Sequence, residues 1–318
     1  GFEVQNQSPN NPGFVIRGIT SDSGSAFNEP RVSVFQDGVS ISKSRGSYVE
    51  LFDIERVEVA RGPQSTLYGR GALIGAVNIV QAKADPYSGY GYLYGDFGNF
   101  GRARGDMTVN MPLGGDLGIR VAARVRERDG YVENLLGGED YNGIKSQAVR
   151  GSLRWSPDRF TFDLIGNYEH DSASGTSFKS IYYNPTDPVT GTVLGDMGRN
   201  SGAALAAADG FPDGGLGLDR QVWGVTGIGN YEFNDNLSLN VIGSFRRFDN
   251  LEVFDPDGIS LPLLTASEDS HGDQTMATMR LTYAVPDVVT AFVGATFYRE
   301  TGDTRVDSQF EERVTLAR

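Results

Sequence analysis

A repeated alternation of apolar and polar residues restricts the fold of this chain more than any other feature. It begins after residue 85 and recurs in segments of about ten residues. In residues 117–128, for example, Leu117, Ile119 and Val121 alternate with Arg120 and Arg124. Successive side chains of a β-strand point to opposite faces, so each segment predicts a strand with one apolar and one polar face. We expect nine such strands, near residues 88–97, 101–111, 117–128, 146–156, 160–170, 220–233, 236–248, 274–284 and 289–300, and residues 309–318 could form a tenth.

The links between these strands alternate between short and long. Short turns are expected at 112–116, 157–158, 234–235 and 285–287, and long polar links at 129–145, 171–219 and 249–273. This asymmetry is typical of a membrane β-barrel, whereas a soluble β-sandwich would show closer turn signals without the alternation. Plugged barrels use about 22 strands. We therefore expect residues 85–318 to form antiparallel transmembrane strands, about 9–10 of about 22, in an incomplete barrel.

Residues 1–84 follow a different pattern, with short apolar runs separated by glycine-containing turns. The runs lie at 14–19, 31–41, 54–62 and 75–80, and residues 64–69 could form one helical turn. The dipeptide Asp37-Gly38 is a strong signal for a hairpin turn. These residues predict a small α+β domain before the barrel strands.

Composition excludes several functional classes. The net charge of −13 argues against a nucleic-acid partner, because binding phosphate requires a basic surface. The chain has no cysteine, so disulfides, thiolate metal sites and cysteine nucleophiles are ruled out. No segment resembles a phosphate-binding loop or a catalytic group of side chains. Residues 255–258 resemble the start of a calcium loop but lack the downstream ligands, so a loop turn is expected there. We therefore expect no cofactor, no resident metal and no enzymatic activity.

One motif in the first domain carries a family resemblance. Residues 52–80 read FDIERVEVARGPQSTLYGRGALIGAVNIV, preceded by the Ile16-Arg17-Gly18 triplet and by a V-x-V-x-x-DG hairpin at residues 32–38. In this order and spacing they resemble the plug of the TonB-dependent outer-membrane receptors. The resemblance covers residues 14–84 specifically. The rest of the chain is similar to that family only through its barrel pattern.

The resemblance implies an organisation and a function. Residues 1–84 would be an N-terminally truncated plug domain, and residues 85–318 part of the barrel; nothing in Gly1–Pro9 resembles the TonB-contacting segment, so an internal fragment is expected. The expected function is active import of a scarce ligand, favouring a ferric siderophore, across the bacterial outer membrane. Its partners would be TonB with its inner-membrane energy complex, a siderophore-like ligand and outer-membrane lipid. Vitamin B12 or oligosaccharide import, a passive porin or adhesion barrel, and a soluble β-rich enzyme are the alternatives.

The same resemblance suggests site residues. Arg17 and Arg61 match arginines that lock plug to barrel by pairing with barrel glutamates, which could lie beyond Arg318. Plug apices and outer loops contact ligand in the family. By position, the candidates for ligand contact are Lys43, Arg45, Tyr48, Tyr182 and Tyr183.

A row of arginines is predicted on the lumen-facing side of the strands, because each lies opposite the apolar face. Such a basic wall could attract an anionic ligand. It could instead pair with plug carboxylates such as Glu50, Asp53, Glu55 or Glu58, and we favour this second interpretation because the plug is expected close by. The row comprises Arg102, Arg104, Arg120, Arg124, Arg126, Arg150 and Arg154, with Arg128 beside them.

Overall fold

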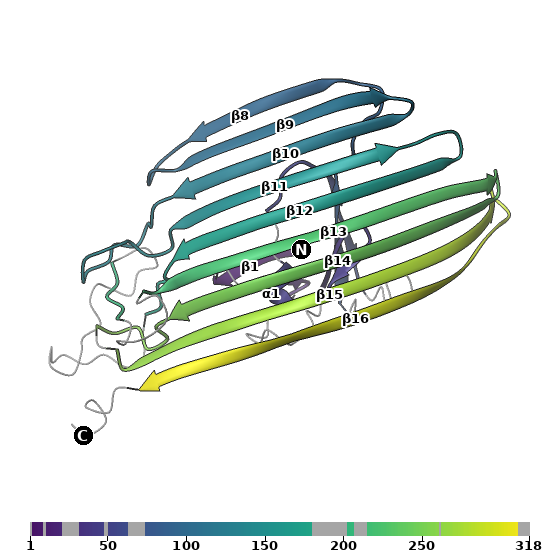
Figure 1. Cartoon of the computed structure of the whole chain (residues 1–318). Coiled ribbons are helices and arrows are strands. Elements are labelled where there is room, and N and C mark those ends of the chain that lie inside the picture. Colours follow the sequence, from purple (N-terminus) through teal and green to yellow (C-terminus); the bar gives the residue numbers. More distant parts are fainter. Residues whose placement is uncertain are drawn as a thin grey trace.

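A curved nine-stranded antiparallel sheet forms most of the molecule, and two smaller sheets lie on one side of it (Figure 1). The structure is a computed structural model. It describes residues 2–8, 11–20, 32–47, 50–62, 74–179, 202–206, 215–260 and 262–310. Within this part of the chain, no helix has the length and apolar content needed to span a membrane.

The large sheet, called the wall below, contains the nine strands expected from the alternation. They follow one another in sequence order, each antiparallel to the next. The predicted fold class is confirmed, and residues 311–318 of the suggested tenth strand lie outside the described residues. The strands are β8 (Tyr90–Phe97), β9 (Ala103–Gly114), β10 (Leu117–Arg128), β11 (Ile144–Trp155), β12 (Phe160–Ser174), β13 (Gly217–Asn234), β14 (Leu237–Phe254), β15 (Leu264–Val285) and β16 (Val289–Phe310).

The later strands are longer than predicted. β15 and β16 have 22 residues each, about twice the number that a tilted strand needs to cross a bilayer. In the added part of β15, outward positions hold Asp269 and His271, and His271 pairs with Asp303 of β16. The expected strand ends were wrong here because the apolar alternation marks only the lipid-facing part of a strand, and these strands continue beyond it.

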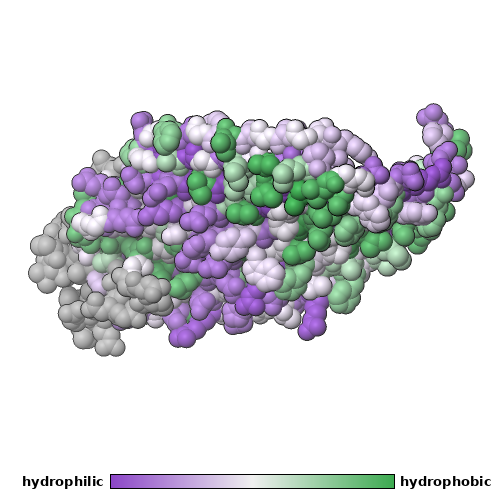
Figure 2. Space-filling model, turned by 45° about the horizontal axis from the view of Figure 1, so that its top comes forward, coloured by the Kyte–Doolittle hydropathy of each residue, from purple (hydrophilic) through white to green (hydrophobic). Residues whose placement is uncertain are grey.

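The two faces of the wall differ in chemistry. The outward face exposes large apolar side chains such as Val125, Val149, Tyr168 and Trp223. The inward face buries polar and charged side chains, among them Arg150, which is only 2% exposed. In Figure 2, hydrophobic residues gather over the middle of the surface, with hydrophilic residues denser toward one end. This is the distribution expected of a barrel wall with lipid outside and a polar interior.

The predicted alternation of links is also confirmed. Consecutive strands are joined by short turns at 115–116, 156–159, 235–236 and 286–288. At the opposite end of the wall, the links span 129–143, 175–216 and 255–263. All long links therefore lie at one end of the wall. The link 98–102 between β8 and β9 lies at the same end but is short.

Residues 2–81, called the N-terminal unit below, form the two smaller sheets. One contains β1 (Phe2–Ser8), β2 (Asn11–Ile16) and β3 (Ile19–Thr20). The other has the order β5-β4-β7-β6, in which β4 and β7 are parallel. Its strands are β4 (Val32–Gln36), β5 (Val39–Ile41), β6 (Ile54–Arg61) and β7 (Gly75–Gln81), and the short helix α1 (Ser44–Ser47) lies between β5 and β6.

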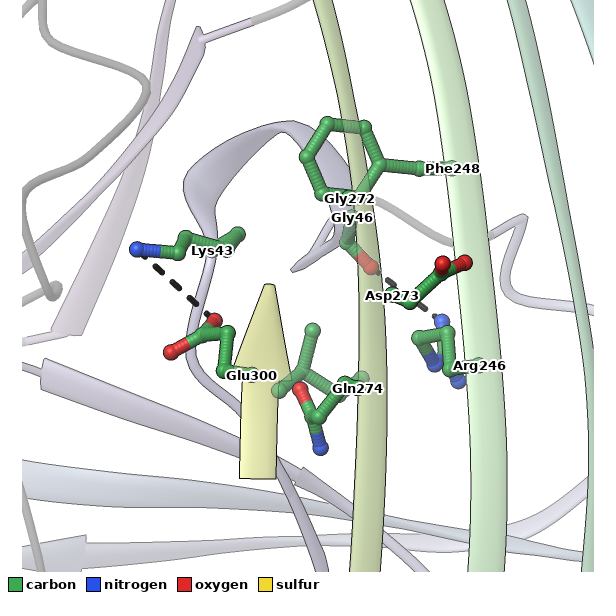
Figure 3. Close-up of a pocket in the computed structure, with 9 residues that line it drawn as sticks. Lys43, Gly46, Arg246, Phe248, Gly272, Asp273, Gln274 and Glu300 are labelled. Atoms are coloured by element: carbon green, nitrogen blue, oxygen red, sulfur yellow. Dashed lines mark hydrogen bonds and ion pairs between the residues drawn. The ribbon is translucent and has the colours of Figure 1, made fainter. Parts of the chain in front are cut away.

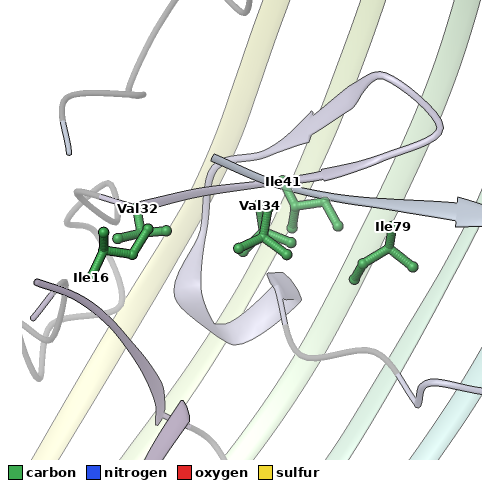
Figure 4. Packing of buried hydrophobic residues seen from close by; sticks show 6 residues of the cluster. Ile16, Val32, Val34, Ile41 and Ile79 are labelled. Carbon is green, nitrogen blue, oxygen red and sulfur yellow. The ribbon is translucent and has the colours of Figure 1, made fainter. Parts of the chain in front are cut away.

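A small apolar cluster holds these two sheets together (Figure 4). Ile16 comes from β2, whereas Val34, Ile41 and Ile79 come from three strands of the other sheet. All four side chains are less than a tenth exposed. β4 is buried along its whole length: β5 and β7 flank its two edges, and Ile16 of β2 packs on one of its faces.

The predicted hairpin turn at Asp37-Gly38 is confirmed between β4 and β5. Both residues have positive φ, 51° and 81°, as a type I′ turn requires. The predicted helical turn at 64–69 lies outside the described residues.

Gly38→Ala should destabilise the N-terminal unit by about 1–2 kcal/mol, because a Cβ is unfavourable at this φ. Thermal unfolding of the purified protein in detergent would measure the change. Gly229→Ala is the matched control: it lies in β13, and an added Cβ meets nothing within 4 Å. It should leave stability unchanged or slightly raised. Equal losses in both variants would contradict the role assigned to the turn.

Candidate functional site

Residues 42–53, which connect β5 to β6, cross the inner face of the wall and are called the strap. Ser42 contacts β16, and Asp53 contacts β10. The strap therefore passes over seven neighbouring strands, whose six gaps of about 4.8 Å amount to about 29 Å. An extended segment of this length covers about 36 Å, so α1 fits within it as one helical turn. Residues 48 and 49 lie outside the described part of the chain.

The first contacts of the strap are with β16 (Figure 3). The Ser42 hydroxyl donates to Glu300 and accepts a hydrogen bond from the Tyr298 hydroxyl. Lys43 Nζ lies 3.8 Å from the same Glu300 carboxylate. Two successive strap residues are thus held by one acidic side chain of the wall.

The next contacts, in the region of α1, reach three strands. Arg45 forms a two-pronged ion pair with Glu268 of β15, with both N–O distances at 2.6 Å. The Arg45 side chain is 4% exposed, so this charge-assisted pair is shielded from water. The carbonyl oxygens of Arg45 and Gly46 accept hydrogen bonds from Arg220 of β13 (3.3 Å) and Arg246 of β14 (3.1 Å).

Glu50 joins the strap to β12 and β10. Its backbone N–H donates to Glu169 Oε2 over 2.7 Å. Its carboxylate pairs with Arg126 and, at 3.3 Å, with Arg124. Arg124 also holds Asp106 of β9 at 2.8 Å, so the guanidinium bridges the strap and a neighbouring strand.

The strap ends on Phe52 and Asp53. Arg150 Nη1 of β11 donates to both of their carbonyl oxygens, at 2.9 and 2.8 Å, and its guanidinium lies over the Phe52 ring, 4.6 Å from the centroid. The Asp53 carboxylate pairs with Arg120 of β10. Buried backbone carbonyls need donors, and here the wall arginines supply them, joined at Asp53 by the backbone N–H of Ala82 at 3.1 Å.

The structure shows the partner of every arginine in the predicted row. Arg120, Arg124 and Arg126 pair with the strap carboxylates Asp53 and Glu50, as in the interpretation we favoured. Attraction of an anionic ligand by the row stays a prediction. The other members are held by wall residues or the strap backbone: Arg102 by Asp96, Arg104 by Asp106, Arg154 by Asp163, Arg150 by the Phe52 and Asp53 carbonyls, and Arg128 by the Asn142 carbonyl.

Two of the carboxylates proposed as partners are placed elsewhere. Glu55 and Glu58 both pair with Arg56 on the exposed part of β6. Sequence reasoning missed the wall acids Glu169, Glu268 and Glu300. Glu169 lies on the polar side of a predicted strand, which was an available signal, whereas residue 268 fell in a predicted loop.

The other predicted site residues are the two lock arginines and the five candidates for ligand contact. Arg17 lies in the β2–β3 turn with φ 53°, Arg61 ends β6, and both are exposed. No ion pair joins either arginine to another residue of the described ranges, so the lock stays a prediction. Ligand contact by Lys43 and Arg45 likewise stays a prediction. Tyr48, Tyr182 and Tyr183 lie outside the described residues.

The long links pack against one another at their end of the wall. Val132 and Tyr141 of the first link form a buried cluster with Ala203 and Leu205 of the second. The Tyr141 hydroxyl donates to the Leu205 carbonyl (3.2 Å) and accepts from the Leu205 N–H (3.1 Å). These links therefore share a core of their own.

Asp255 ties the third link to the second. Its carboxylate is buried and accepts hydrogen bonds from the backbone N–H of Ala206 (3.0 Å), Asp257 (2.9 Å) and Gly258 (3.1 Å). Burial, together with the nearby Asp257 carboxylate, raises the pKa of Asp255 to about 7. The proton on this carboxyl therefore stabilises the docked link.

Docking of the third link should depend on pH. Because the pKa is raised in the docked state above an ordinary value of about 3.9, the stabilisation is complete below about pH 4 and is lost as pH rises to about 7. Hydrogen exchange of the Ala206 amide, corrected for the intrinsic effect of pH, should show protection that falls as pH rises from about 4 to about 7. Asp255→Asn should remove the dependence. Equal protection of the parent at both pH values would contradict it.

Asp53→Ala should weaken attachment of the N-terminal unit by about 3 kcal/mol or more, because it leaves the buried Arg120 guanidinium without its carboxylate. The urea concentration at which added protease cleaves the unit would report the loss. Glu58→Ala is the control, since it breaks an exposed pair with Arg56 and should change little. The same urea midpoint for both variants would show that the buried pair stabilises the attachment no more than the exposed pair does.

Comparisons with known proteins agree with this architecture. The model of the TonB-dependent Receptor Plug Domain matches residues 1–76. The pesticin receptor of Yersinia pestis is 30% identical over 200 residues, covering 62% of this chain and 27% of the receptor. The ferrioxamine B receptor of Salmonella typhimurium is 30% identical over 180 residues, covering 54% and 23%. The chain spans about a quarter of the length of these curated relatives.

Solved structures share the fold. The ferric yersiniabactin uptake receptor FyuA from Yersinia pestis superposes with a TM-score of 0.76 at 22% identity, covering 98% of this chain and 45% of that one. The siderophore receptor PiuA from Acinetobacter baumannii gives 0.70 at 16% identity, covering 93% and 40%. With the plug match and the strap-bound wall, these similarities place the chain in the TonB-dependent outer-membrane receptors, as a plug followed by nine consecutive strands of the barrel.

Proposed function

We propose that the receptor containing this chain imports a ferric siderophore across the bacterial outer membrane, with energy delivered through TonB from its inner-membrane complex. The observation that carries this proposal is the plug held to the inner face of the wall by buried ion pairs. A ligand cannot pass such a plug by simple diffusion, and breaking buried charge pairs requires energy. This distinguishes the receptor from a passive porin or an adhesion barrel.

The ligand class follows from the relatives. Their names refer to ferrioxamine B, yersiniabactin and other siderophores. Import moves the ligand without altering a covalent bond, so we propose a transporter and not an enzyme. Vitamin B12 and oligosaccharides are the alternative cargoes. The apolar outward face of the wall would contact outer-membrane lipid.

The ends of the strands and the hydrogen bonds of Asp85 support a boundary between residues 84 and 85. β7, the last plug strand, ends at Gln81, and β8 begins at Tyr90. Between them, Asp85 is fixed to the wall by Asn110, which accepts from its N–H and donates to its carbonyl, each at 2.9 Å. We assign residues 1–84 to the plug and residues 85–318 to the barrel on this basis.

The complete gene should restore growth of an iron-starved strain that lacks its own siderophore receptors, when ferrioxamine B or ferric yersiniabactin is the only iron source. Restoration should disappear when tonB is deleted, because the plug would then stay in place. Uptake of radioactive iron in both backgrounds would measure the difference. Equal uptake without TonB would support a passive pore, and uptake of vitamin B12 alone would identify a different cargo.

A further inference from the structure

The strap differs from the rest of the plug in where its backbone hydrogen bonds go. In β4, β6 and β7 the backbone groups bond within the plug's own sheet. In the strap, five carbonyl oxygens accept from wall arginines, and one N–H donates to a wall glutamate. The strap groups involved are the carbonyls of Arg45, Gly46, Leu51, Phe52 and Asp53 and the N–H of Glu50.

The strap also carries the buried charges that join plug and wall. Arg45, Glu50 and Asp53 each pair with a wall side chain of opposite charge. If the strap left the wall, these charges and the backbone groups between them would lose their partners at the same time. Buried charges that lose their partners are among the most costly groups in a protein.

The plug body is joined along a weaker seam. β4 and β7 are far apart in sequence, and their parallel pairing extends over five residue pairs, from Val32–Gly75 to Gln36–Ile79. Parting this seam breaks backbone hydrogen bonds, opens a small apolar cluster and breaks one ion pair, between Lys83 and Asp37, against the three that hold the strap. Departure of the whole plug needs every strap contact to break, whereas a rearrangement at the seam needs none of them to break.

We propose that the strap stays bound to β10–β16 during import while the rest of the plug rearranges around it. This inference rests on the proposed function, and names the part of the plug that does not move. The strap would then form one fixed border of the path that the ligand takes.

The structure offers a tether that tests this directly. A Cβ built on Gly46 of the strap lies 4.0 Å from Phe248 Cβ of β14. Disulfides join Cβ atoms about 3.5–4.5 Å apart. Gly46 has no positive φ that would exclude a side chain, and the chain has no cysteine of its own. Gly46→Cys with Phe248→Cys should therefore form a single disulfide that fastens strap to wall.

The tether would be placed in the complete receptor, with the two single variants as matched controls for loss of the glycine or the ring. Uptake of iron-loaded ferrioxamine B and ferric yersiniabactin would be compared before and after reduction. We expect the oxidised receptor to import within about twofold of the reduced one, since the strap has no need to move. Uptake that stops on oxidation and returns on reduction would overturn the proposal.

A second readout reports whether the plug body moves. Ala76→Cys lies in β7 and is 1% exposed. Under energised import it should become labelled by a maleimide added from the periplasmic side, whereas the single Gly46→Cys should stay protected. Labelling of both positions, or of neither, would contradict a plug that rearranges around a fixed strap. A cysteine-free parent that imports neither complex would instead contradict the proposed import function.

Discussion

Arginines on the inner face of the wall are the groups on which this structure depends. An inward face of charged side chains cannot be buried unless each charge finds a partner. The strap provides two of these partners as carboxylates and others as backbone carbonyls, so the plug and the wall complete each other's polar groups. The plug therefore supplies polar partners to the inner face of the wall, and its own apolar core is small.

Much of the wall could be predicted from the sequence, because the alternation that marks a strand depends only on residues that are close together in the chain. Alternation located all nine strands and put Arg120, Arg124 and Arg150 on the inward face, since both follow from the period of a single strand. The strand ends were less predictable. Near His271 the outward face is no longer apolar, and the pattern disappears although the hydrogen-bonded ladder continues. The Asp37-Gly38 turn was predictable because its φ angles demand these residue types.

The contacts of the strap could not be predicted in the same way. Arg45 and Glu268 are separated by 223 positions, and no local pattern relates them. Their meeting depends on how many strands lie between β10 and β16 and on the register of each. Arg45 therefore seemed a candidate for ligand contact, and its ion pair to β15 became visible only in three dimensions. The pairing of Arg120 with a plug carboxylate was predicted, because the plug was expected inside the wall.

The transverse course of the strap has a consequence for assembly. If one strand slips by two residues against its neighbour, every apolar side chain still faces lipid, so alternation alone does not reject the error. The slip nevertheless displaces each inward side chain by about 7 Å along the strand. Glu169, Arg220 or Glu268 would then miss its atom on the strap. Because the strap contacts all seven strands, its docking favours their correct register, and a wrongly paired wall would be left with an undocked plug.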